Sequence, residues 1–161
     1  MLLAVADTKA VVKLGAEGHS LAHLRLLVAG AVRAPEDDAP EGASSAELTA
    51  LADRLGQPLP SALRTWLSIC NGAAIGPGGV FGQRPGRRFL DMAGVRDQYL
   101  QWRELGWIPV AGDGCGNYYV LTADGTVGFV ETMSDPAALA RHVAPDLLSF
   151  MTGLLAAGQS T

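Results

Sequence analysis

The chain has 161 residues, of which 48% are hydrophobic and 17% are charged. This length is typical of one domain with a single core, and the composition excludes disorder over most of the chain. Twelve basic and 16 acidic residues give a formal net charge of −4. This balance excludes a general nucleic-acid binder, because such proteins need a basic face.

The first 43 residues carry weak signals. Ser20 is placed to cap a helix, and the apolar positions after it follow a helical period. Residues 34–43 contain two prolines and four acids, which predicts a linker. The N-terminus has no basic stretch before its apolar run, and no run is long enough to span a bilayer. We expect a soluble, cytoplasmic protein with two reduced cysteines.

Two helices are predicted next. Ser44 and Glu47 have capping-box spacing, so the first helix begins there, and Gly56 ends it. The second begins at Pro60, which suits the first helical turn, and ends at Asn71-Gly72. Each has an apolar stripe at helical spacing, formed by Leu48, Leu51, Ala52 and Leu55 in the first and by Leu63, Trp66, Leu67 and Cys70 in the second.

Residues 73–88 have the composition of a glycine-rich loop, with short strands possible at Val80-Phe81 and Phe89-Leu90. A single third helix is expected after it, because Val95, Tyr99, Trp102 and Leu105 fall on one stripe and Gly106 can end it.

The pattern then changes to strands at residues 107–111, 117–122 and 126–131. Asp124-Gly125 predicts a tight hairpin. Pro109 cannot donate to a ladder, so either the first strand lies at a sheet edge or Pro109 lies at its start. Helices are expected to open at Pro136 and Pro145. The predicted fold class is α+β: an antiparallel or mixed β-sheet meander with helices packed against it, on one face.

The stretch Gly112-Asp113-Gly114-Cys115-Gly116-Asn117 is the most conspicuous candidate for chemistry. It fails as a dinucleotide fingerprint, because a strand comes after it where a helix is needed, and it fails as a calcium loop. We interpret it as a turn between two strands. A nucleophilic Cys115 would need a histidine base, and nothing in the sequence places His19, His23 or His142 beside it. His19 and His23 have helical spacing but no third ligand nearby. We therefore predict no catalytic residue, no cofactor site and no metal site.

Four segments together resemble the SUKH superfamily of Smi/Knr-type proteins and bacterial immunity proteins. Residues 59–67 with Asn71-Gly72 resemble its opening helix motif, and residues 107–121 resemble its strand-turn-strand hallmark. Residues 126–131 and 144–155 resemble its next strand and its closing helix. The resemblance covers residues 59–155, arguably 44–155, and leaves residues 1–43 unmatched.

The resemblance implies a non-enzymatic domain over residues 44–158 that binds another protein, preceded by an N-terminal segment over residues 1–43. In bacteria it implies an immunity protein that neutralises a cognate toxin, often a nuclease. The alternative is an intracellular regulatory or scaffold protein of the Smi/Knr type. The motif positions are Asn71, Gly72, Trp107, Asp113, Gly114, Gly116 and Asn117, and they resemble fold determinants.

We expect the immunity function to act by occlusion, with an acidic surface steered to its partner by opposite charge. The candidate acidic contacts are Glu36, Asp37, Asp38, Glu131 and Asp135. Three arginines of the glycine-rich loop, Arg84, Arg87 and Arg88, are either solvated or a recognition surface for an anionic patch. The sequence leaves the partner's identity and the oligomeric state open.

Overall fold

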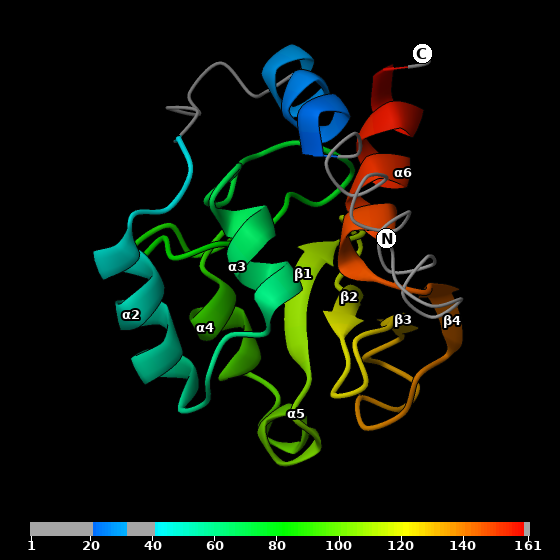
Figure 1. Ribbon diagram of the computed structural model, residues 1–161. Coiled ribbons are helices and arrows are strands. Elements are labelled where there is room, and N and C mark those ends of the chain that lie inside the picture. Colours follow the sequence, from blue (N-terminus) through cyan, green and yellow to red (C-terminus); the bar gives the residue numbers. More distant parts are fainter. Residues whose placement is uncertain (1–20, 32–40, 160–161) are drawn as a thin grey trace, which may run out of the picture.

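The computed structural model describes residues 21–31 and 41–159, and its centre is a four-stranded antiparallel sheet (Figure 1). The strands lie in sequential order, each paired with its neighbour along the chain. They are β1 (Ile108–Gly112), β2 (Tyr118–Leu121), β3 (Val127–Val130) and β4 (Arg141–Ala144). The predicted antiparallel meander is therefore confirmed, and β1 is at an edge of this sheet, one of the two positions that Pro109 allows. Residues 79–81 bond to its outer side.

Helical segments surround this sheet (Figure 1). They are α2 (Ser45–Leu55), α3 (Ser61–Leu67), α4 (Met92–Arg96), α5 (Leu100–Leu105) and α6 (Leu147–Gln159), with a further helix over residues 21–30. α2 begins with the predicted capping box, because Ser44 Oγ accepts from the amide of Glu47 and the Glu47 carboxylate accepts from the amide of Ser44. α3 ends at Leu67, earlier than predicted, and turns with amides bonded to Trp66 O continue to Cys70.

The prediction of a single third helix is wrong. The chain forms two short helices, α4 and α5, separated by residues 97–99. Tyr99 takes an extended backbone conformation at the start of α5 (φ −130°, ψ 90°), and its ring stacks on Trp102 with 4.3 Å between centroids. The break thus lets two aromatic rings three residues apart pack together against the sheet.

Pro136 does not begin a helix, contrary to the prediction. Residues 141–144 instead form β4, a strand whose first three residues are exposed. Exposed Arg141 and His142 give no apolar alternation, so the sequence does not indicate this strand. The carbonyl of Pro136 accepts a hydrogen bond from Trp102 Nε1 at 2.5 Å, which holds the loop before β4 against α5.

Both faces of the sheet are covered, so the expectation that helices pack on one face is wrong. Neighbouring residues of a strand point to opposite faces. Tyr118 packs edge-on against Trp102 of α5 (5.7 Å between centroids), whereas Tyr119 lies 4.9 Å from the Phe150 ring of α6. The covering on both sides explains why every residue of β1 and β3 is buried.

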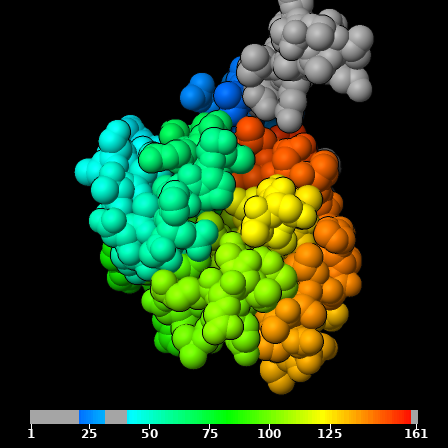
Figure 2. Space-filling view, turned by 60° about the horizontal axis from the view of Figure 1, so that its bottom comes forward, coloured from blue at the N-terminus to red at the C-terminus, as the bar shows by residue number. Residues whose placement is uncertain are grey.

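One hydrophobic core joins the sheet to the helices. Trp66 of α3 and Trp102 of α5 are fully buried within it. Figure 2 shows α2, α5, the turn at residues 122–126 and the segment after β3 together on one face. Arg103 of α5 donates to the carbonyl of Leu55 at 3.1 Å, which ties α5 to the end of α2 on that face.

Candidate functional site

A buried asparagine fixes the base of the glycine-rich loop. Asn71 is 3% exposed, and its Oδ1 accepts from the amide of Gln83 at 2.8 Å. Its Nδ2 donates to Glu47 Oε2 at 3.1 Å and to Gln83 O at 3.3 Å. A buried amide with all these partners satisfied is a strong positional constraint. Asn71 therefore joins the start of α2 to the far side of the loop.

An ion pair fixes the same loop to the other end of α2. Arg54 of α2 donates to Asp91 in a bidentate pair, with N···O distances of 2.8 and 2.6 Å, and also to Gln83 Oε1 at 2.8 Å. The hydrogen bond to Asp91 raises the pKa of Arg54 above its ordinary value. Because the pair is two-pronged and Asp91 is buried, it holds both ends of residues 83–91 in place.

Arg84 belongs to this framework and not to the surface. It is 8% exposed, and its Nη1 donates to the carbonyl of Gly72 at 2.6 Å. The expectation that Arg84 contacts a partner is corrected, because a side chain this deeply buried is not available to one. Arg87 is half-buried and Arg88 is exposed, and both lie at the tip of the loop.

The corner between β1 and β2 is built around Asp113. Its carboxylate accepts from the amides of Cys115 (2.7 Å) and Asn117 (3.0 Å) and from Asn117 Nδ2 (3.0 Å). Burial alone would raise the pKa of Asp113, but these hydrogen bonds together lower it below its ordinary value. The corner is therefore an anionic turn whose carboxylate is hydrogen-bonded to groups of the turn itself.

The acidic turn after β3 is attached to this corner. Thr132 Oγ1 donates to Gly116 O at 2.8 Å, and the Thr132 amide donates to Asn117 Oδ1 at 3.2 Å. Glu131 and Asp135 flank it and are both exposed, and Met133 between them is 96% exposed. The structure thus bonds the turn that carries these two predicted acidic contacts to the corner motif through Thr132.

The glycine-rich loop packs directly on the same corner. A Cβ added to Gly78 would lie 2.7 Å from the carbonyl oxygen of Gly112 and closer still to the amide of Gly114. A Cβ added to Gly114 would lie 2.6 Å from Pro77 O, and Gly114 also has a positive φ of 85°. Only glycine permits this backbone contact, so loop and corner form one rigid unit.

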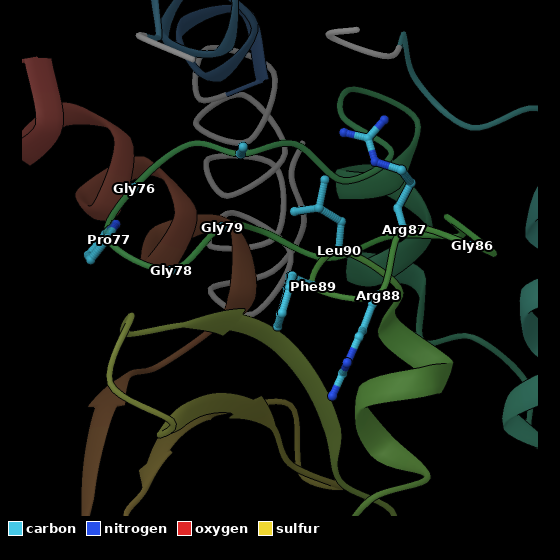
Figure 3. A pocket seen from close by; sticks show the side chains of 10 residues that line it. Gly76, Pro77, Gly78, Gly79, Gly86, Arg87, Arg88, Phe89 and Leu90 are labelled. Carbon is cyan, nitrogen blue, oxygen red and sulfur yellow. The ribbon is translucent and has the colours of Figure 1, made fainter. Parts of the chain in front are cut away.

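Two adjoining hollows lie along this unit. The first, about 440 Å³, lies between residues 74–79 and residues 86–90. Figure 3 shows Arg87 and Arg88 on one side of it and Gly76, Gly78 and Gly79 on the other. The second, about 240 Å³, lies against the corner and is lined by Phe81, Tyr118 and Asn117. Both hollows share Gly78, Arg88 and Phe89.

Phe89 is a candidate binding residue that the sequence places in a short strand and does not single out. The residue lies in a turn, and its side chain is 76% exposed between the two hollows. Arg88 lies over its ring at 5.5 Å from the centroid. The run Pro85-Gly86-Arg87-Arg88-Phe89 is the available signal, since a proline–glycine turn exposes the residues after it.

The remaining predicted residues lie in several parts of the chain. Trp107 lies immediately before β1, is half-buried and packs against the core. Glu36, Asp37, Asp38 and His19 lie outside the described residues. Cys115 is a free, exposed thiol on the corner.

Within the described parts of the chain, no group of three metal-binding side chains occurs, and no helix is long and apolar enough to cross a membrane.

These features define a class of protein: an α+β domain with a four-stranded antiparallel sheet and a glycine-bounded corner between its first two strands. Residues 42–153 match the SMI1 / KNR4 family (SUKH-1). The match covers most of the chain, so the protein belongs to that family, and the resemblance seen in the sequence is confirmed. No curated protein matches the chain.

Proposed function

We propose that this protein is a non-enzymatic, cytoplasmic binding module that neutralises a cognate toxin by covering its active surface. The domain over residues 44–158 would do the binding. Membership of the SMI1 / KNR4 family supports a protein-binding role. The single observation that carries the proposal is the turn at residues 131–135, where exposed Met133 stands between two exposed acids.

This turn has the composition of a contact for a basic partner. Protein interfaces combine apolar anchors with a polar rim, and methionine is enriched in them. The hydrogen bonds of Thr132 to the corner fix the turn, so little conformational freedom is lost on binding. Glu131 and Asp135 add negative charge at the rim, which speeds association with a basic surface and is screened by salt.

The test is co-expression of the chain with the toxin-like product of a neighbouring gene. The proposal predicts rescue of growth and a stable complex, whose association rate falls as salt rises. Met133→Ser combined with Glu131→Lys should weaken the complex at least tenfold. Leu100→Ser is the matched control, because Leu100 is 77% exposed on α5 and outside this turn. Absence of rescue, or equal binding by both variants, would contradict the proposal.

A regulatory role without a toxin is the second candidate, since the matching family is itself described by SMI1 and KNR4. It predicts that the same turn binds an endogenous cellular protein and that no toxin gene neighbours this one. Binding of a cellular protein that is lost in the Met133→Ser/Glu131→Lys variant, without any growth rescue, would favour this role.

A further inference from the structure

The two hollows beside Phe89 form a surface that the acidic turn does not explain. They adjoin across a ridge formed by Arg88 and Phe89 and have volumes of about 440 and 240 Å³. The larger falls in the range of ligand-binding clefts, and both open to solvent. Their shared ridge means that a ligand filling both must pass over Phe89.

The charge of this surface is opposite to that of the chain as a whole. The protein carries a net charge of −4, yet among the described residues no Asp or Glu lines either hollow. Arg87 and Arg88 line the first, and Arg88 also lines the second. An arginine beside an open cleft favours a carboxylate, to which its planar fork can donate two hydrogen bonds.

The ridge also presents an aromatic anchor. A comparison within the molecule shows that this exposure is not a general result of arginine–phenylalanine pairing. Arg141 lies 4.3 Å over the ring of Phe129, but that ring is 7% exposed and belongs to the core, whereas Phe89 is 76% exposed. Large, open aromatic side chains next to a cleft are typical of binding anchors.

The second hollow continues the aromatic surface inward. Phe81 and Tyr118 line it with 6.0 Å between their centroids, and the Tyr118 ring also packs on Tyr99. Burial, together with the influence of Tyr99, raises the pKa of Tyr118, so its phenol stays neutral. Asn117 and Gln98 add polar groups at the edge. A ligand with a carboxylate next to an apolar side chain would therefore match the arginine between the two hollows and the aromatic lining of the second hollow.

We infer that the ridge of Arg88 and Phe89, with the hollows on its two sides, docks an extended acidic peptide segment of a partner protein, one that combines Asp or Glu with an aromatic or aliphatic side chain. The carboxylate would pair with Arg88 on the ridge. The apolar side chain would pack on Phe89 and enter the hollow over Phe81 and Tyr118. The glycine contacts of residues 77–78 with the corner keep the cleft in place before binding.

No residue of the turn at residues 131–135 lines either hollow, although Thr132 bonds to Gly116 and Asn117 at the edge of the second one. The inference depends neither on the acids of that turn nor on a toxin. A peptide segment is favoured over a second copy of the chain because the surface is made of two hollows, of about 440 and 240 Å³, that share Arg88 and Phe89, and hollows of this size accept single side chains. A nucleic acid is disfavoured by the overall negative charge, which would repel phosphates around the two arginines.

The test is selection of a random peptide library displayed on phage against the full chain. The inference predicts enrichment of peptides that combine Asp or Glu with an aromatic or aliphatic residue. A synthetic copy of the most enriched peptide should bind about tenfold more weakly to Arg88→Glu and to Phe89→Ser, while Arg88→Lys should retain part of the affinity. Amide NMR shifts on binding should map to residues 76–79, 86–90 and 112–118.

Two controls make the result specific. Arg141→Glu removes an arginine whose aromatic partner is buried, and Leu100→Ser removes an exposed apolar side chain outside the cleft. Both should bind the peptide like the unaltered chain. Enrichment of basic or uncharged peptides, no enrichment, unchanged binding by Arg88→Glu and Phe89→Ser, or Phe89-dependent dimerisation without peptide binding would each overturn the inference. Met133→Ser should leave peptide binding intact, which separates this test from that of the proposed function.

Discussion

Two corners of the sheet, residues 113–117 between β1 and β2 and residues 122–126 between β2 and β3, have similar hydrogen bonds but different surroundings. Asp113 and Asp124 each accept from the amide two residues further on, and each is succeeded by a glycine of positive φ, Gly114 at 85° and Gly125 at 90°. The first corner packs against the glycine-rich loop and bonds to Thr132. A Cβ at Gly125, in contrast, would meet nothing within 4 Å.

The contrast shows that local turn chemistry alone does not mark a functional surface. Both corners are closed by a carboxylate and a glycine, which is enough to reverse the chain. The corner between β1 and β2 has the backbone of a second loop packed on its glycine and a third turn bonded to it. The hairpin at residues 122–126 borders Trp107 and His142, but no backbone packs on its glycine. The candidate binding surfaces lie on the loop and the turn at the first corner, which supports them.

The strongest loss of stability is expected at the contact between loop and corner. Gly78→Ala should destabilise the fold by about 3 kcal/mol, because its Cβ would press on the backbone of Gly112 and Gly114, which cannot move aside like a flexible side chain. Chemical denaturation monitored by circular dichroism measures this change. Gly153→Ala is the control, since its Cβ would meet nothing within 4 Å, and an equal loss in both variants would refute the rigid contact.

A matched pair of glycines tests the contrast between the corners directly. Gly125→Ala should cost about 1–2 kcal/mol, the backbone penalty of a positive φ. Gly114→Ala should cost about 1–3 kcal/mol more, because the same penalty is joined by a 2.6 Å approach to Pro77 O. Thermal unfolding of the two variants side by side gives the difference. Equal unfolding temperatures would mean that the loop does not press on the first corner.

The two aspartates predict a dependence on pH. Hydrogen bonds from Thr122 and Thr126 lower the pKa of Asp124 to about 2, and the hydrogen bonds to Asp113 outweigh its burial and lower its pKa below the ordinary value as well. A lowered pKa contributes stability that is present above the ordinary value and is lost as pH falls through the folded value. Both corners should therefore weaken below about pH 4.

Asp113→Asn should cost about 1 kcal/mol at neutral pH, because Asn117 Nδ2 loses its carboxylate acceptor. Asp124→Asn, at a fully exposed corner, should cost less. Measured as unfolding free energy against pH, the gap between the unaltered chain and Asp113→Asn should narrow as the pH drops below about 4. A gap that stays constant with pH would show that the carboxylate charge of Asp113 plays no part.

The weakest effect on stability is expected at the ridge. Phe89→Ser should change the unfolding free energy by less than about 0.5 kcal/mol, since the ring is mostly in water in the folded state. Phe81→Ser at the floor of the second hollow should cost several times more, because that ring is buried. Unfolding curves of the two variants test this difference, and a large loss in Phe89→Ser would mean that the ring is part of the core.

The sequence predicts the elements whose causes are local. The capping box at Ser44, the hairpin at Asp124-Gly125 and the restriction of Pro109 to a sheet edge or a strand start each depend on one or two residues and their own backbone needs. The family motifs are also recognisable, because their order and spacing need no knowledge of the contacts. For the same reason, the sequence identifies Asp113 and Asn117 as the frame of the first corner.

The features that the sequence does not predict depend on contacts between segments that are distant along the chain. The break between α4 and α5 arises from the packing of Tyr99 on Trp102 and Tyr118, which no helical period reveals. β4 is exposed, so it lacks the alternation that marks a strand. The cleft needs Gly78 to meet Gly112, and only the folded chain brings them together. The burial of Arg84 against Gly72 also has no local signal, so the sequence places this arginine at the surface.

We propose that this protein binds a partner protein through segments supported by the first corner. Hydrogen exchange of the full chain, alone and in complex with its protein partner, is the decisive measurement. We expect added protection at residues 76–90, 112–118 or 131–135 and none at the hairpin of residues 122–126. Protection confined to that hairpin and α5 would show that the binding surface lies elsewhere and would overturn this proposal.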